Sequence, residues 1–134
     1  MLDSPPVLIV CCDAAQGNEA MKIVRRVGLE ARLCATLTDA RTLTGLQIFQ
    51  LVLCDDELPD CNLRTAIRVL STSTGGVPVI VLSHLAEWPA YIRALSAGAF
   101  DYIACPPEPV EADRILRLAI QQNPPPRHAS RAAA

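Results

Sequence analysis

The chain has 134 residues, a length typical of one domain, and 51% of them are hydrophobic, which is enough for a buried core. Charged residues make up 19% of the chain, so the composition excludes a disordered polyelectrolyte. The formal net charge of −2 gives no electrostatic reason to expect nucleic acid or an anionic membrane as a direct partner. No apolar run approaches the ~20 residues that span a bilayer. The first residues lack the basic and apolar regions of a signal peptide, so we expect a cytoplasmic protein.

The first half of the chain predicts two strand-helix units and the strand of a third. Residues 7–10 form a short β-branched apolar run, as expected for a strand buried on both faces. Helical spacing of apolar residues follows and ends at Gly28, a typical helix stop. Residues 30–35 alternate between polar and apolar, which suits a strand at a sheet edge, and residues 38–47 favour a helix. A second continuous apolar run, residues 51–54, predicts the next buried strand.

The second half repeats the same alternation. Apolar residues recur at helical spacing between positions 63 and 70, and residues 77–82 form the third buried strand. A helix is expected around residues 88–95, followed by a strand at residues 100–104. Pro109 suits the first turn of a last helix, which runs through Ile115 and Ala119.

Strands that alternate with helices predict one doubly wound α/β domain with a parallel sheet. We expect five parallel strands in the flavodoxin-like order 2-1-3-4-5 over residues 1–122. Residues 123–134 are rich in proline and alanine and are expected to form a tail or a linker.

The carboxyl ends of the predicted strands carry the residues of chemical interest, because ligands collect at that edge of an open α/β sheet. These ends are residues 11–13, 54–60, 82–84 and 101–106, and they hold carboxylates, a serine, a histidine and several of the six cysteines. No Cys-x-x-Cys spacing occurs, which excludes the usual zinc and thioredoxin motifs.

Three segments in this order, residues 51–60, 77–83 and 97–102, resemble the receiver domains of two-component response regulators. The resemblance covers roughly residues 6 to 122 and implies that an aspartate at the end of the third strand accepts a phosphoryl group. The matching residue is Asp55, four residues before Pro59. The resemblance also implies that Ser83 binds the phosphoryl group and that Tyr102 is the aromatic residue that responds.

The chain departs from the family pattern at four positions. Cys11 and Cys12 stand where the family has an acidic pair that holds Mg²⁺, and Cys105 stands where it has a lysine that pairs with the phosphate. His84 replaces a small residue that leaves room for the incoming group. Because phosphoryl transfer depends on neutralising charge around the phosphate, we expect phosphorylation of Asp55 to be impaired or lost.

Two hypotheses address what the pocket could still bind. Asp13 and Glu57 could join Asp55 in a weak magnesium site, because each offers a carboxylate close to the missing ligands. Alternatively, Cys12 and Cys105 could form a thiol site that acts as a redox switch or binds a soft metal, or they simply fill space as neutral groups.

These observations favour a signalling receiver that is not an enzyme and acts by protein-protein contact. A sensor histidine kinase or phosphotransfer protein and an effector or output domain are the expected partners, and the chain is either a stand-alone receiver or a fragment. Receivers commonly form homodimers through the face of their fourth helix, fifth strand and fifth helix. Near this face we expect the aromatic side chains either to form an exposed patch or to pack in the core; they are Trp88, Tyr91 and Tyr102. We predict a cis Cys105-Pro106 bond.

Two alternatives to this function remain open. The first is a pseudo-receiver scaffold that binds its partner regardless of phosphorylation. The second is a flavodoxin-like binder of flavin or another small molecule. The first strand-helix turn argues against the flavin binder, because it lacks a loop rich in Gly, Ser or Thr that could wrap a phosphate.

Overall fold

The computed structural model describes residues 4–84 and 88–122. Each predicted strand and helix is found, and the elements follow in the order β1 (Val7–Val10), α1 (Ala14–Arg26), β2 (Ala31–Cys34), α2 (Leu37–Leu46), β3 (Leu51–Asp55), α3 (Leu63–Ser73), β4 (Val79–Ser83), α4 (Trp88–Ser96), β5 (Asp101–Ala104) and α5 (Pro109–Gln122). Gly28 and Gly98 follow α1 and α4 with positive φ angles of 85° and 106°, as expected for helix stops.

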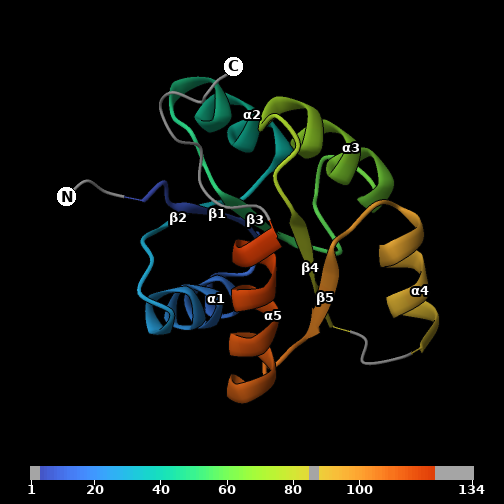
Figure 1. Ribbon diagram of the computed structural model, residues 1–134. Helices are drawn as coiled ribbons and strands as arrows, with labels where there is room; N and C mark the ends of the chain where they lie inside the picture. Colours follow the sequence, from blue (N-terminus) through green and yellow to red (C-terminus); the bar gives the residue numbers. More distant parts are fainter. Residues whose placement is uncertain (1–3, 85–87, 123–134) are drawn as a thin grey trace.

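The strands form one parallel sheet in the order β2-β1-β3-β4-β5, which confirms the predicted flavodoxin-like topology. Figure 1 shows α1 and α5 on one side of the sheet and α2, α3 and α4 on the other. The central strands β1, β3 and β4 are buried along their whole length, because helices cover both of their faces.

Each face of the sheet has its own core, because successive side chains of a strand point to opposite sides. Val7 and Ile9 of β1 pack with α1 and α5, whereas Leu8 and Val10 pack with helices of the opposite layer. The edge strand β2 is only partly covered, as its alternation predicts, and its Leu33 methyl groups would lie 3.1 Å from a Cβ at Gly17 of α1. With a larger residue at Gly17, the Leu33 side chain would have to shift by a few tenths of an ångström.

Polar caps begin the helices directly after the strands and so position the carboxyl edge of the sheet. Asp13 caps α1 by accepting from the Gln16 N–H, Thr36 caps α2, and Asn62 caps α3. Only two residues separate the last residue of β1 from the Asp13 cap. The segment that holds Cys11 and Cys12 is therefore held close to the end of β3.

The Cys105-Pro106 peptide bond is cis, as predicted. Within the described residues, no helix has the length and apolar character needed to cross a membrane. The predicted tail, residues 123–134, and the side chain of Trp88 lie outside what the structure describes, so the part of the aromatic patch that depends on Trp88 stays a prediction.

Candidate functional site

Asp55 is the last residue of the central strand β3, and its side chain is only 2% exposed. One carboxylate oxygen, Oδ1, accepts a hydrogen bond from the Glu57 backbone N–H at 3.1 Å. The other, Oδ2, lies 3.4 Å from the thiol of Cys11, which donates to it. The predicted acceptor carboxylate thus stands at the carboxyl edge of the sheet, but its oxygens are already engaged and shielded from solvent.

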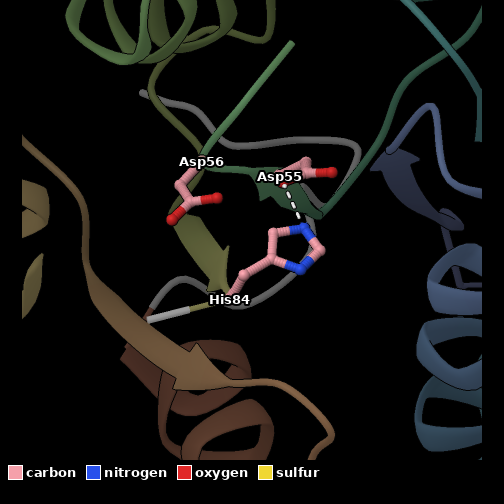
Figure 2. A group of neighbouring side chains, drawn as sticks. All are labelled: Asp55, Asp56 and His84. Atoms are coloured by element: carbon pink, nitrogen blue, oxygen red, sulfur yellow. Dashed lines mark ion pairs between the residues drawn. The ribbon is translucent and has the colours of Figure 1, made fainter. Parts of the chain in front are cut away.

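The imidazole of His84 lies against Asp55 and contributes to its burial. Its Nε2 atom is 3.4 Å from Asp55 Oδ1, while the histidine side chain itself is 42% exposed (Figure 2). His84 follows directly after β4, which is the neighbour of β3, so the sheet register brings the two residues together. The position where a small residue would leave Asp55 open is therefore occupied by a ring in contact with the carboxylate.

Asp56 is the second carboxylate of the site, and it holds the hydroxyl predicted to bind a phosphoryl group. The Ser83 hydroxyl donates to Asp56 Oδ2 at 2.8 Å, while Asp56 Oδ1 is buried and has no hydrogen-bond donor among the described residues. Burial raises the pKa of the Asp56 carboxyl, and the neighbouring Asp55 adds to this rise, although Ser83 and His84 act in the opposite direction. The hydroxyl that the resemblance assigns to phosphoryl binding thus donates to the carboxylate of Asp56.

The cysteines near the site are unpaired, and burial makes the thiols of Cys11 and Cys105 harder to ionise. Burial and the adjacent Asp55 raise the pKa of Cys11 to about 12, and burial and the two aspartates raise the pKa of Cys105 to about 11. Cys12 is exposed, whereas Cys54 points into the core on the side of α2, α3 and α4. Since the thiolate is the reactive form, neither Cys11 nor Cys105 has the surroundings of a reactive thiol.

The other predicted magnesium ligands, Asp13 and Glu57, have different roles. Asp13 caps α1 and is exposed, and the side chain of Glu57 is exposed while its N–H serves Asp55. The side chains that converge are instead Asp55, Asp56 and His84, whose ligating atoms all lie within 4.8 Å of one another. The magnesium set of Asp55, Asp13 and Glu57 stays a prediction.

The predicted switch residue Tyr102 lies on β5, at the far edge of the sheet. Its ring packs edge-to-face against Tyr91 of α4, with the ring centroids 5.4 Å apart, and both side chains are partly buried. A cavity of about 570 Å³ lies beside them, lined by residues of α4, β5 and α5. Tyr91 and Tyr102 therefore pack against each other and are also partly exposed, so they combine the two predicted alternatives of core packing and an exposed patch.

The sequence reasoning missed Asp56 as a site residue. Within a strand, neighbouring side chains point to opposite faces of the sheet. However, β3 ends at Asp55, and the chain turns immediately beyond it, so that both carboxylates lie at the same edge. The signal that could have identified Asp56 was the Asp55-Asp56 pair itself, in the loop that ends at Asn62, the cap of α3.

Together, the strand order and the buried carboxylate at the carboxyl end of the central strand place the chain among flavodoxin-like α/β domains with an acidic site at that edge. A family model described as the response regulator receiver domain matches residues 7–117, and the chain therefore belongs to this family. This agrees with the resemblance in the strand-end segments.

Individual proteins support the same assignment. The chain is 29% identical over 117 residues to the DNA-binding response regulator MtrA of Mycobacterium tuberculosis, covering 87% of this chain and 51% of MtrA. A crystal structure of a candidate response regulator from Chloroflexus aurantiacus is 25% identical with a TM-score of 0.81, covering 89% of this chain and 99% of that one. The receiver domain of the sensor histidine kinase PA1611 from Pseudomonas aeruginosa, crystallised with magnesium in its active-site cleft, is 27% identical with a TM-score of 0.76, covering 88% and 98%.

The chain spans only part of the curated relatives that it matches. It covers about half of MtrA, 24% of the transcriptional regulatory protein ZraR of Salmonella typhimurium and 20% of the response regulator protein PilR of Pseudomonas aeruginosa. The family assignment therefore applies to the receiver domain, and the activities of the longer proteins do not transfer with it.

Proposed function

We propose that this receiver domain relays a signal by protein-protein contact and that phosphorylation of Asp55 is impaired or lost. The observation that supports this most directly is the contact between His84 and Asp55, which leaves the carboxylate 2% exposed. A phosphoryl donor must approach a carboxylate oxygen in line. Here Asp55 Oδ1 faces the His84 ring and the Glu57 N–H, and Oδ2 faces the Cys11 thiol.

The charges around Asp55 favour the same conclusion. Mg²⁺ prefers oxygen ligands, whereas the group that approaches Asp55 from β1 is the neutral thiol of Cys11. The site thus lacks the oxygen ligand from the end of β1 that the family uses to hold magnesium. Cys105 adds no positive charge where the family has a lysine, and each lost charge contact costs on the order of 10²-fold or more in rate.

The partners we propose are a sensor kinase or phosphotransfer protein and an effector or output domain, in a cytoplasmic setting. The surface of α4, β5 and α5 is a suitable place for an effector or a second copy of this chain, because Tyr91 and Tyr102 line a cavity there beside Asp101 and Arg114. The domain needs no catalytic activity toward a substrate for this role.

A pseudo-receiver that works without any phosphorylation is the second candidate, and the burial of Asp55 specifically favours it. In that case Asp55 contributes to the local hydrogen-bond network and not to chemistry. The two candidates differ in one measurable property, which is whether Asp55 ever gains a phosphoryl group.

Incubation with acetyl phosphate and Mg²⁺, followed by intact-protein mass spectrometry, tests the proposal. We expect a slow or absent gain of one phosphoryl mass in the natural chain. A variant that restores the family residues, His84→Ala with Cys11→Asp, Cys12→Asp and Cys105→Lys, should react at least ~10²-fold faster. Adding Asp55→Asn to that variant should abolish the gain and serves as the matched control.

The outcomes separate the candidates. A slow reaction that depends on Asp55 supports an impaired receiver, and no reaction in the natural chain supports the pseudo-receiver. If the natural chain reacted as fast as the restored variant, the contact with His84 and the missing charges would have no effect, and the proposal would be wrong.

A further inference from the structure

Asp55, Asp56 and His84 form a convergent set of ligands from two neighbouring strand ends. Asp55 and Asp56 stand at the end of β3, and His84 directly follows β4, with the imidazole turned toward Asp55 (Figure 2). Their ligating atoms all lie within 4.8 Å of one another. Two carboxylates and one imidazole at this spacing are a common ligand combination for transition-metal ions.

Two features of the cluster are unfavourable unless a cation lies among these groups. First, Asp56 Oδ1 is buried without a hydrogen-bond donor in the described part of the chain, and an unsatisfied buried oxygen is costly. Second, two adjacent carboxylates repel one another, and within the described residues their ion-pair partner is not a lysine or arginine but His84, which itself offers a ligand nitrogen. A bound divalent cation would remove both penalties.

We propose that Asp55, Asp56 and His84 bind a single divalent transition-metal ion of the Zn²⁺ type. In a tetrahedral zinc site, ligand atoms about 2.0–2.1 Å from the ion lie about 3.4 Å from each other. The distance between His84 Nε2 and Asp55 Oδ1 is 3.4 Å, which matches this spacing. Asp56 supplies the third ligand through Oδ1, the oxygen that Ser83 does not use.

The same residues select against Mg²⁺. Magnesium requires octahedral oxygen coordination and binds imidazole poorly, whereas imidazole is a preferred ligand of zinc. The nearest thiol does not compete for the role of ligand, because Cys11 Sγ donates to Asp55 Oδ2 and to the Asp13 carbonyl. The site is therefore a nitrogen and oxygen site, distinct from the thiol site considered from the sequence.

The ion has a path to this site from solvent. His84 is 42% exposed and lines a cavity of about 300 Å³ together with Asp13 and Cys105. Three protein ligands leave one tetrahedral position for water. The proposed ion would use Oδ1 of Asp55, the oxygen that faces His84, and its binding does not depend on whether Asp55 is ever phosphorylated.

Titration of the metal-free, reduced chain with ZnCl₂ in competition with a chromophoric chelator tests this proposal. We expect one equivalent to bind, millimolar Mg²⁺ not to compete, and His84→Ala to weaken the affinity at least ~10-fold. Asp56→Asn should weaken it similarly. His128→Ala changes the only other histidine and Cys12→Ser changes an exposed thiol, so both serve as matched controls that should keep the natural affinity.

Cobalt identifies the ligands by a second measurement. Co²⁺ bound at this site should give a spectrum of nitrogen and oxygen ligation without a sulfur-to-cobalt charge-transfer band. The proposal is overturned if the natural chain binds no zinc, if His84→Ala binds as well as the natural chain, or if Cys12→Ser or Cys105→Ser removes binding. His84 is a surface residue, so its variant should fold, and circular dichroism verifies this.

Discussion

Replacing Asp56 by asparagine should stabilise the metal-free domain. The change preserves the shape of the side chain, and the amide oxygen can still accept from the Ser83 hydroxyl. The amide NH₂ takes the place of the buried oxygen that lacks a donor, and it can donate toward Asp55. A repulsive pair of carboxylates would thereby become an attractive pair.

The distances in the cluster set the size of this effect. At a separation of 4.8 Å, the upper limit for the ligating atoms, two unit charges repel by about 3.5 kcal/mol at an effective dielectric constant of about 20 and by about 0.9 kcal/mol in water. Asp56 is partly exposed, so we expect a gain between these limits, about 1–3 kcal/mol. For a domain of this size the melting temperature should rise by at least about 3 °C.

Thermal and urea denaturation in the presence of a chelator, followed by circular dichroism, measure this gain. The pKa of Asp56 is raised in the folded state by burial and by Asp55, so the folded protein favours the protonated form. The natural chain therefore loses stability as the pH rises from the ordinary aspartate value through this higher pKa. The advantage of Asp56→Asn should be largest at neutral pH and should shrink as the solution becomes acidic.

A matched control removes one negative charge elsewhere. Glu30 is exposed just before β2, and Glu30→Gln should change the stability by less than about 0.5 kcal/mol at any pH. If Asp56→Asn destabilised the domain at neutral pH, or behaved like Glu30→Gln, then carboxylate repulsion would not be a feature of this site and the reasoning about the cluster would be refuted.

Two further predictions concern ionisable groups near the site. Cys105, with a pKa of about 11, should react with iodoacetamide at pH 8 roughly 10²-fold more slowly than free cysteine. Its labelling rate, followed by peptide mapping, should rise about tenfold per pH unit up to that pKa. Fast labelling of Cys105 at pH 8 would support a thiol switch instead. Asp60→Asn should lower the melting temperature at neutral pH, because the Asp60 carboxylate accepts from the Leu37 and Thr38 N–H groups at the start of α2, bonds that lower its pKa. This contribution is present above the ordinary aspartate pKa and is lost as the pH falls through the lowered one, so a difference from the natural chain that persisted in acid would contradict it.

The order of elements could be predicted from the sequence because its signals are local. Apolar runs such as residues 51–54 and glycine stops such as Gly28 need only a few neighbours to be interpreted, and strand-helix alternation leaves few topologies. The same signals placed Asp55 at the end of β3, and the resemblance to receiver domains singled it out through its spacing to Pro59. The missing acidic pair and lysine are also visible in the sequence.

The partners of each side chain were decided by the tertiary structure. Ser83 and Asp56 are 27 residues apart, and Asp60 and Leu37 are 23 apart, so no local pattern pairs them. Beyond the strand ends the two-residue alternation stops, and loop geometry directs the side chains. The sequence by itself thus determined a receiver fold with an altered acceptor pocket. Only the folded chain brought His84 and Asp56 to Asp55, because sheet register and the turns after β3 and β4 control which groups meet.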